Sequence, residues 1–399
     1  MTSELSPPSQ RRTSHVARRT LHITHLIARL NDGGPARVLA SLGREMEARG
    51  HRVTVLAGCC APDEPDLAAT LRAQGMTVEI IAGLGRRVSP WSDVRAYGVI
   101  RQRLAELAPD VVHTHTAKAG ALGRLACRSL GIPCLHTYHG HVLNGYFHPL
   151  LSLAMCWVER FCAWQHHHQA LTPSLRDELC GRFRIGREKN WHVLPVPVEP
   201  VTATRAPWQN NLKPALPVIG FLGRLAPVKD LGLWLDTLAV LAARQPVQGL
   251  ICGDGAQRAW GENRAQELGI PVLFTGFVPA GEALAVMDLL LITSRNEGLP
   301  LVAVEAAGVL GRDGVPVVAV PVGGLCDLIQ QGLVQGAQRH PEALAAACSE
   351  LLRNEFQRST LQQRARILAT DLSPSALAGA YEAMYRVTMT DRSGADTMK

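Results

Sequence analysis

The sequence predicts an α/β protein built from two doubly wound domains that face each other across a cleft. Short runs rich in β-branched residues alternate with longer helical patterns along most of the 399 residues. This alternation is typical of a parallel sheet covered by helices on both faces. It stops in one segment rich in proline and polar residues and then begins again, so two domains are expected.

The first half consists of a basic segment followed by the first domain. Residues 1–19 contain four arginines against one glutamate and are predicted to be a disordered tail. The first domain is predicted over residues 20–196. Its strands are expected at LHITHLIA (21–28), HRVTVLAG (51–58), DVVHTH (110–115) and IPCLHTYH (132–139), with helices near 35–49 and 118–130.

The second half repeats this rhythm after a linker, which is predicted over residues 197–216. The second domain is expected over 217–372, and a final helix over 373–390 is expected to pack back on the first domain. The strands predicted in the second domain are PVIGFLGR (217–224), VQGLICGD (247–254), PVLFTGF (271–277), DLLLITS (288–294) and VPVVAV (315–320). Open α/β sheets bind ligands beyond the carboxyl ends of their strands, so function is expected on the loops that follow strands.

The composition excludes several classes of protein. The chain is 47% hydrophobic and 19% charged, which indicates a globular protein with a sizeable core rather than a disordered one. Its formal charge of +7 comes partly from the tail and is too dilute elsewhere for a dedicated nucleic-acid surface, so no nucleic-acid partner is expected. Ten cysteines without a C-x-x-C pair predict reduced, mostly buried thiols in a cytoplasmic protein.

The longest strongly apolar stretch, LLSLAMCWV at 150–158, is much shorter than the roughly 20 residues that cross a bilayer. Aromatic residues surround it and would let a helix rest in a membrane interface. These are Tyr146, Phe147, Trp157, Phe161 and Trp164. A helix of the protein core is the favoured interpretation, with the interfacial helix as its alternative.

A cationic loop follows the first strand of the second domain. In GFLGRLAPVKD, Arg224 and Lys229 come just before the helix LGLWLDTLAVL. A guanidinium and an ammonium at a helix start are suited to bind a diphosphate. Two ordinary surface cations are the alternative, although lysine is scarce in this chain.

Two glutamates lie in the stretch SRNEGLPLVAVEAAG, residues 294–308. Glu297 and Gly298 are expected in the loop before a helix that begins near Pro300, whereas Glu305 is expected on the helix itself. Carboxylates accept hydrogen bonds from hydroxyl groups, and cations bind phosphates. Together with the cationic loop, this stretch suits a nucleotide-diphosphate sugar, which has hydroxyls at both ends and phosphates in the middle. The alternative, a surface role for Glu305, fits poorly with its apolar neighbours.

Glycine-rich turns follow other strands. In NDGGPARVL, Gly33 and Gly34 let the backbone approach a ligand closely before a helix starts near Pro35. In ICGDGAQR, Gly253 and Gly255 superficially match a dinucleotide fingerprint. The third glycine and a suitable acidic residue are missing, so a tight turn is predicted there.

Histidines gather around the strand expected at 132–139. His136, His139 and His141, with His113 and His115, are candidate metal ligands. No carboxylate lies among them and strand alternation would separate them between faces, so a metal site is not expected. A single histidine at the strand end, His139, is expected to present a polar group to a substrate.

Taken together, these stretches resemble the retaining, sugar-nucleotide-dependent glycosyltransferases of family four, which have the GT-B fold. The resemblance spans roughly residues 21–329. It is carried by NDGGPARVLASLGREMEARGHRVTVLAG, DVVHTHTAKAGALGRLACRSLGIPCLHTYHG, GFLGRLAPVKDLGLWL, ICGDGAQR, VLFTGFVP, and SRNEGLPLVAVEAAG followed by VPVVAVPVGG.

The resemblance implies a role for each candidate residue, and it implies neither a cofactor nor a metal. His139 and Glu297 would act at the donor sugar as the catalytic pair. The remaining candidates would bind the donor: Arg224 and Lys229 at the diphosphate, Glu305 at the ribose, the N–H groups of Gly298, Leu299 and Leu301 at sugar and phosphate, and Gly33 and Gly34 by close backbone approach. The leaving diphosphate would help to take the proton of the acceptor, and catalysis would rest on cations and N–H dipoles.

The chain departs from the family pattern at HVLPVPVEP, where an Asn-Gly hinge is usual, in the long connection GVLGRDGVPVV, and at LVQGAQRH, where a Gly-rich turn is usual. The stretch HTAKAG to HTYHGHVLNGYF is most similar to enzymes that build bacterial surface polysaccharides, such as lipopolysaccharide or capsule, on lipid-linked acceptors. The resemblance therefore implies a glycan or lipid-linked acceptor and a peripheral position on the cytoplasmic face of the inner membrane. A GT-B-type epimerase and a non-catalytic sugar-nucleotide-binding protein are the alternatives.

Overall fold

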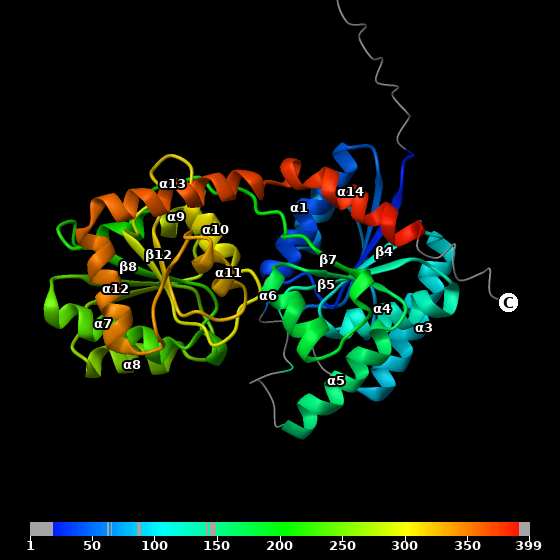
Figure 1. The fold of residues 1–399 in the computed structure, drawn as a ribbon, viewed down its shortest axis with the longest axis horizontal. Helices are drawn as coiled ribbons and strands as arrows, with labels where there is room; N and C mark the ends of the chain where they lie inside the picture. The colour runs from blue at the N-terminus through cyan, green and yellow to red at the C-terminus, as the bar shows by residue number, and fades with distance from the viewer. Residues whose placement is uncertain are drawn as a thin grey trace, which may run out of the picture.

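The computed structural model describes residues 19–61, 64, 66–85, 89–140, 143 and 149–390. It has two α/β lobes side by side (Figure 1). Each lobe contains one fully parallel sheet with helices on both faces, so the predicted fold class of two doubly wound domains is confirmed. Residues 1–18 of the tail predicted at 1–19, together with His141, Tyr146 and Phe147, lie outside the described residues.

The sheet of the first domain has the strand order β3-β2-β1-β4-β5-β6-β7. Its strands are β1 His22–Ile27, β2 Arg52–Ala57, β3 Thr77–Ile80, β4 Val111–His115, β5 Cys134–Tyr138, β6 His167–Ala170 and β7 Trp191–Val193. Its helices are α1 Gly34–Ala48, α2 Ala68–Ala73, α3 Pro90–Leu107, α4 Ala117–Leu130, α5 Pro149–Ala163 and α6 Pro173–Arg176, with a π-helical turn at Asp177–Arg182 and a 3-10 turn at Glu188–Asn190.

The sheet of the second domain has the order β10-β9-β8-β11-β12-β13. Its strands are β8 Val218–Leu222, β9 Gln248–Cys252, β10 Val272–Gly276, β11 Leu289–Ile292, β12 Val317–Ala319 and β13 Gln335–Gly336. Its helices are α7 Leu231–Arg244, α8 Arg258–Glu267, α9 Ala280–Leu284, α10 Leu301–Ala307, α11 Gly324–Gln330, α12 Pro341–Arg353 and α13 Glu355–Asp371.

Helix α7 illustrates why these segments fold as they do. Leu231, Trp234, Leu235 and Leu238 recur at the helical spacing of three and four residues, and all four side chains are buried against the sheet. The helix ends at Arg244, whose positive charge suits the carboxyl end of a helix.

Two segments connect the lobes. The chain crosses first after β7, through irregular structure that includes a 3-10 turn at Pro207–Asn211. It crosses back from α13 into α14 (Pro374–Thr390), which packs on α1 and on the end of β4 and β5 in the first domain (Figure 1). The two crossings touch, because the backbone N–H of Val198 donates to the carbonyl of Leu372 at 2.8 Å.

In both sheets the strand order reverses beside the first strand of the domain. The loops after β1 and β4 in one sheet, and after β8 and β11 in the other, therefore open at a topological switch point, where doubly wound sheets bind ligands. These four loops carry most of the residues singled out in the sequence.

Candidate functional site

Helix α1 begins at the face of the first domain that meets the second domain. Its N-cap is Gly33 and its first residue is Gly34, with Pro35 next, close to the predicted start. A side-chain carbon at Gly34 would lie 3.4 Å from Cδ1 of Leu301, the first residue of α10. The predicted glycine turn and the predicted glutamate stretch therefore face each other across the domain boundary.

The end of β5 meets the same part of the second domain by backbone contact. A side-chain carbon at Gly298 would lie 2.0 Å from the carbonyl oxygen of His139 and 3.0 Å from the nitrogen of Gly140. Only glycine allows this approach. His139 and Gly298, which are far apart in the sequence, are thus direct neighbours across the cleft.

Glu297 lies in the loop after β11, residues 293–300, which we call the Glu297 loop. Its Oε1 atom accepts from the Lys229 ammonium at 2.5 Å and from the Ser294 hydroxyl at 2.6 Å. Its own carbonyl accepts from the backbone N–H of Gly324 at 3.1 Å. The carboxylate and the lysine predicted to bind a donor are therefore paired with each other in the ligand-free protein.

Glu305 lies on α10 and its side chain is only 12% exposed. Its Oε1 is 3.7 Å from Nη1 of Arg37 on α1, and Arg37 is itself held by two bonds to Asp32, of 2.6 and 3.1 Å. Burial raises the pKa of the Glu305 carboxyl, and the Arg37 charge opposes that rise. A cation of the first domain thus faces a carboxylate of the second.

Arg224 lies in the loop after β8 and is exposed. Within the described part of the chain, its guanidinium forms no ion pair and no hydrogen bond, in contrast to Lys229. The loop itself is held by Gly253 and Gly255, because side-chain carbons there would lie 1.9 and 2.4 Å from the carbonyl oxygens of Gly223 and Leu225. The tight turn predicted for ICGDGAQR therefore backs the cationic loop.

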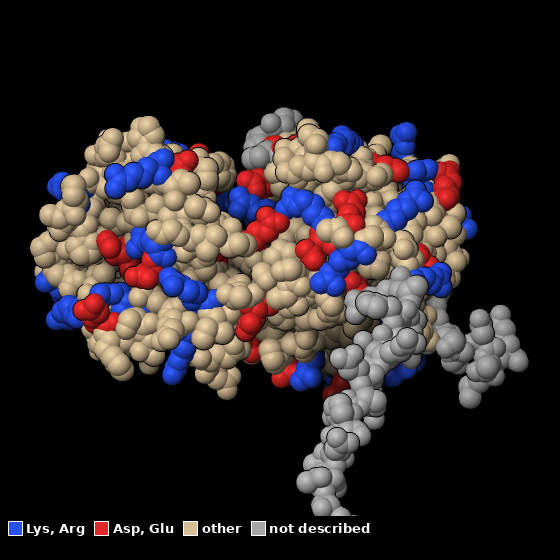
Figure 2. Space-filling view, turned by 90° about the horizontal axis from the view of Figure 1, so that it is seen from above, with Lys and Arg blue, Asp and Glu red and all other residues tan. Residues whose placement is uncertain are grey.

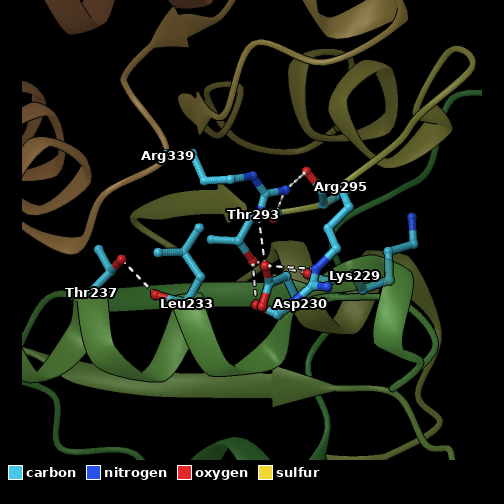
Figure 3. Close-up of polar contacts among 8 residues, drawn as sticks. Lys229, Asp230, Leu233, Thr237, Thr293, Arg295 and Arg339 are labelled. Carbon is cyan, nitrogen blue, oxygen red and sulfur yellow. Dashed lines mark hydrogen bonds and ion pairs between the residues drawn. The ribbon is translucent and has the colours of Figure 1, made fainter. Parts of the chain in front are cut away.

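A second cluster of charged residues, Arg295 and Arg339 around Asp230, holds the same loops (Figure 3). Arg295 and Arg339 both donate to the carboxylate of Asp230, at 3.1 and 2.5 Å. Arg339 also donates to the carbonyls of Thr293 and Ser294, so it connects the Glu297 loop to the segment that carries Lys229. In Figure 3 the Lys229 amine points away from this cluster.

The pairs around Arg37 and Arg339 were not predicted, although signals existed for both. Arg37 follows the glycine turn of NDGGPARVL, and the signal for its ion pair is the nearby Asp32 in the same stretch. Arg339 lies in LVQGAQRH, the segment that replaces the Gly-rich turn usual in the family. The structure shows that this segment supplies a side chain that holds the Glu297 loop.

The predicted helix at the Glu297 loop is confirmed with a shift of one residue. Pro300 is the N-cap of α10 rather than its first residue. Leu299 is buried and Leu301 is half buried, so their side chains pack inward and only their backbone groups can serve a ligand.

As strand alternation predicts, the histidines are divided between the two faces of the sheet. His113 and His115 share one face of the sheet with His25 of β1, whereas His136 bonds to Thr114 on the other face. Ring nitrogens of His25, His113 and His115 lie within 4.8 Å of one another. His25 was missed because the parallel pairing of β1 with β4 cannot be derived from either strand alone.

Helix α5 packs one face against the core, as the favoured interpretation predicts, and leaves aromatic side chains exposed at the other face. Cys156, Cys162 and Ala163 are buried, but Trp157, Phe161 and Trp164 are 62%, 60% and 57% exposed. No helix among the described residues is both long and apolar enough to cross a membrane.

The chemistry available at this site follows from its charges. Arg224 and Lys229 are cations of the second domain and Arg37 is a cation of the first, while Glu297 and Glu305 are carboxylates on the loop and helix that follow β11. Cations and helix-start N–H groups can hold a diphosphate, while carboxylates can accept bonds from sugar hydroxyls. Basic and acidic side chains are mixed elsewhere on the face drawn in Figure 2, without a broad basic surface.

Two family models match most of the chain. The model described as Glycosyltransferase Family 4 matches residues 32–201, and the one described as Glycosyl transferases group 1 matches residues 216–354. Each match covers one of the two domains.

Curated relatives agree with these models. A GDP-mannose-dependent alpha-mannosyltransferase of Mycolicibacterium smegmatis is 30% identical over 365 residues, which cover 84% of this chain and 89% of the relative. A 2-deoxystreptamine glucosyltransferase of Streptomyces kanamyceticus is 35% identical over 231 residues. That match spans 52% of this chain and only 57% of the relative's length.

Among solved structures, the chain resembles Anabaena Alr3699/HepE in complex with UDP and glucose. The TM-score is 0.75 and the sequence identity is 19%, with 92% of this chain and 100% of the other covered. At this identity the likeness concerns the fold alone.

Proposed function

Because the chain belongs to glycosyltransferase family 4 and has the two-domain GT-B fold, we propose that it moves a hexose from a nucleotide-diphosphate sugar to a hydroxyl group. The donor is UDP- or GDP-linked, the anomeric configuration is retained, and no metal ion or other cofactor takes part. The acceptor is a glycan or a lipid-linked glycan in bacterial surface polysaccharide synthesis.

One observation carries this proposal: loops after strands of both sheets converge on the same cleft with opposite charges. The first domain contributes the start of α1 and His139, and the second contributes Lys229, Glu297 and Glu305. Carboxylates that flank a group of cations match a molecule whose hydroxylated ends flank a diphosphate.

Arg224 and Lys229 bind the diphosphate in this proposal. As the bond from the anomeric carbon to the diphosphate breaks, positive charge develops on the sugar and negative charge on the leaving oxygen. The two cations and the N–H groups of Gly298, Leu299 and Leu301 stabilise that negative charge without having to reorient. Lys229 exchanges its partner from the Glu297 carboxylate to phosphate.

The carboxylates and His139 bind the hydroxylated parts of the donor. Glu305 accepts from the ribose hydroxyls, and Glu297, released from Lys229, accepts from a hydroxyl of the donor sugar. His139 lies against Gly298 and contacts the sugar near the bond that breaks. The acceptor oxygen bonds to the anomeric carbon on the face that the diphosphate leaves, and its proton passes to a phosphate oxygen.

The test of the proposed reaction begins with donor binding. A panel of UDP- and GDP-linked hexoses is screened by thermal shift, since a ligand at about 100 times its dissociation constant adds about 2.7 kcal/mol of stability. The donor found is then incubated with and without a glycan acceptor, and the product is examined by NMR for the configuration at the anomeric carbon.

We expect an α-linked product from an α-linked donor, formed only when acceptor is present. Addition of a chelator should not prevent its formation. Conversion of the sugar without acceptor would identify an epimerase instead. Tight binding without any turnover would identify a non-catalytic sugar-nucleotide-binding protein. An inverted product would contradict the proposed stereochemistry.

The outer face of α5 supports a peripheral position at the cytoplasmic face of the inner membrane. The guanidinium groups of Arg160 and Arg187 lie over the rings of Trp157 and Trp164, at 5.3 and 4.9 Å from the ring centres. Exposed aromatic rings with interleaved cations suit the interface of an anionic bilayer. This face would bring the cleft to a lipid-linked acceptor.

Vesicle sedimentation tests this position. The wild-type protein is expected to sediment with vesicles that contain phosphatidylglycerol, and the double variant Trp157→Ser and Phe161→Ser to remain in the supernatant. Phe356 on α13 is 82% exposed and lies in the second domain, so Phe356→Ser is the matched control and should sediment as the wild type does. Equal sedimentation of all three proteins would contradict the membrane placement.

A further inference from the structure

A file of three imidazole rings extends from the cleft into the first domain. Nε2 of His139 is 3.0 Å from Nδ1 of His115, and Nε2 of His115 is 3.0 Å from Nδ1 of His25. His115 is the last residue of β4, and His25 lies on the neighbouring strand β1. Both of these rings are fully buried, whereas His139 is only partly buried.

The rings of this file are neutral at physiological pH. Desolvation lowers the pKa of His25 to about 3 and that of His139 to about 4, and it lowers the pKa of His115 well below its usual range. A neutral imidazole has one N–H group and one lone pair. Each ring in a hydrogen-bonded file must therefore donate on one side and accept on the other, so the three tautomers are coupled.

The inner end of the file determines its direction. Nε2 of His25 is buried and has no hydrogen-bond partner within the described part of the chain. Buried N–H groups without an acceptor are rarer in proteins than buried acceptors that lack a donor. The unpartnered nitrogen is therefore assigned the lone pair, and the N–H of His25 lies on Nδ1 and donates to His115.

We propose that His25 and His115 are positioning residues that hold His139 as its Nδ1–H tautomer, with that N–H directed to the donor sugar. His25 donates to Nε2 of His115, and Nδ1–H of His115 donates to Nε2 of His139. The free nitrogen of His139 is then a hydrogen-bond donor and not an acceptor. This inference rests on the proposed function, because that function places the sugar next to His139.

A metal ion held by His25, His113 and His115 is the competing interpretation of this cluster. His113 uses both of its ring nitrogens in the fold, with Tyr385 of α14 at 2.9 Å and with Thr137 at 2.6 Å. His115 likewise uses both of its nitrogens in the file. A metal would have to break at least two of these bonds, so the hydrogen-bonded file accounts for the arrangement better.

The end of β4 is held firmly enough to orient a neighbouring ring. Thr116, which follows His115, has a φ of 66°, which is unusual for a β-branched residue. Its hydroxyl accepts from the N–H of Ala28 in the loop after β1 at 3.3 Å. Strained residues of this kind persist where the surrounding structure fixes them.

The test removes the inner ring without touching the cleft. His25→Leu places a side chain of similar size among apolar neighbours such as Ile23 and Val55, so the protein is expected to fold. Without its donor, His115 can reverse, and His139 should become a mixture of tautomers. Long-range ¹H–¹⁵N NMR of the ligand-free protein reads the tautomer of His139 directly.

Kinetics supply the second readout. We expect kcat to fall about tenfold in His25→Leu while KM for the donor changes less than about twofold, because the lost bond matters most as charge develops. His25→Asn, whose amide N–H can donate to His115, should recover part of the loss. His192→Leu breaks a similar imidazole pair with His167, at 2.9 Å in β6 and β7, and should leave kcat and the His139 tautomer unchanged.

Several results would overturn the proposal. An unchanged tautomer and an unchanged kcat in His25→Leu would show that the file orients nothing, and equal losses in the Leu and Asn variants would show a packing role only. Stoichiometric metal in the purified wild type, absent from His25→Leu, would establish the metal site instead. If His25→Leu does not fold, the variant His115→Asn can be used instead. It keeps an amide group beside His139 but removes the connection to His25, so His139 should again be a mixture of tautomers.

These outcomes are distinguishable from failure of the proposed function. The NMR measurement uses the ligand-free protein and requires no turnover, so it decides the existence of the file by itself. Wild-type activity in His139→Ala would remove the role of His139 in the reaction and leave the tautomer result standing.

Discussion

Gly298 offers the sharpest test of how the two domains meet. In the change Gly298→Ala, the added carbon would lie 2.0 Å from the carbonyl oxygen of His139 and 2.6 Å from its carbonyl carbon. Side-chain carbons essentially never approach another atom closer than 3.0 Å, so the backbone must shift by about 1 Å. Neither contact is the end of a flexible side chain, so the shift must occur between the domains or within the Glu297 loop.

The expected cost follows from this displacement. Glu297 is the residue before Gly298 and is bonded to Lys229, so a shift of the loop moves both groups. A misplacement of about 1 Å in a catalytic arrangement can lower turnover by about 100-fold, or about 2.7 kcal/mol in activation free energy. The loop itself has no special backbone conformation at Gly298, so global stability should change by less than about 1 kcal/mol.

The assay compares turnover, donor binding and thermal stability with those of a control glycine variant. Gly379 lies on α14 with no atom within 4 Å of an added carbon, and Gly379→Ala should keep full turnover and gain stability, by up to about 1 kcal/mol. Gly298→Ala should keep the wild-type unfolding temperature within a few degrees and lose turnover. Turnover within about twofold of wild type in Gly298→Ala would refute the close approach as a requirement for catalysis.

Three further predictions concern the charges. Lys229→Ala and Arg224→Ala should each remove about 1.5 to 3 kcal/mol of bonding to the diphosphate and lower turnover at least tenfold, with the larger effect for Arg224; unchanged kinetics would contradict the diphosphate site. Glu305→Ala should mainly weaken nucleotide binding by calorimetry and Glu297→Ala should mainly lower kcat, whereas the opposite split would exchange their roles. Acid should destabilise the fold, because the pKa of His25 is lowered from 6.5 to about 3 and the unfolded chain therefore binds the proton first. The contribution of His25 to stability is complete above about pH 6.5 and declines below it, by roughly 2 kcal/mol at pH 5. His25→Leu should flatten this decline in denaturant titrations.

Local chemistry was sufficient to predict the fold class and the loops that matter. Strand-like runs between helical patterns determine a parallel sheet, and the carboxyl ends of such strands define where ligands bind. Arg224, Lys229 and Glu297 could be found because each lies in the loop that follows a buried apolar strand. Their positions along the chain already place them at one edge of the sheet.

Several elements escaped prediction because their local signals are weak. Strand β3 (Thr77–Ile80) is short and half exposed, and β13 (Gln335–Gly336) is only two residues long and contains no large apolar side chain. Both are strands because a neighbouring strand offers unpaired backbone groups. Tertiary pairing therefore overrides propensity at these two places.

The partners of the site residues depend on register and on domain closure, which one sequence does not encode locally. His25 meets His115 only because β1 and β4 pair in parallel with a particular offset. Arg37 meets Glu305 only because α1 of one domain faces α10 of the other. Arg339 lies more than 100 residues after Asp230, and a loop after β13 brings the two together.

The ion pairs of the ligand-free cleft explain why Arg224 should matter more than Lys229 for donor binding. A lysine already bonded to Glu297 at 2.5 Å must give up that bond before it binds phosphate, so its net contribution is the difference between two charge-assisted bonds. Arg224 has no such partner among the described residues, and its bond to the diphosphate is gained without this loss. The loss for Glu305 on donor binding is expected to lie between those for Lys229 and Arg224, because its contact with Arg37 is long, at 3.7 Å.

The same exchange links donor binding to closure of the domains. The side chains of Glu297 and Glu305 are both largely buried, and their cationic partners reduce the cost of burying these carboxylates. One of these partners, Arg37, belongs to the opposite domain, so this ion pair stabilises the contact between the two domains. A ligand favours closure of the domains only if it binds the closed arrangement more tightly than the open one. A donor that replaces the Arg37 contact must therefore form bonds to both domains at once. Binding of the nucleotide alone should therefore close the cleft less than binding of the complete nucleotide sugar, whose sugar also reaches His139.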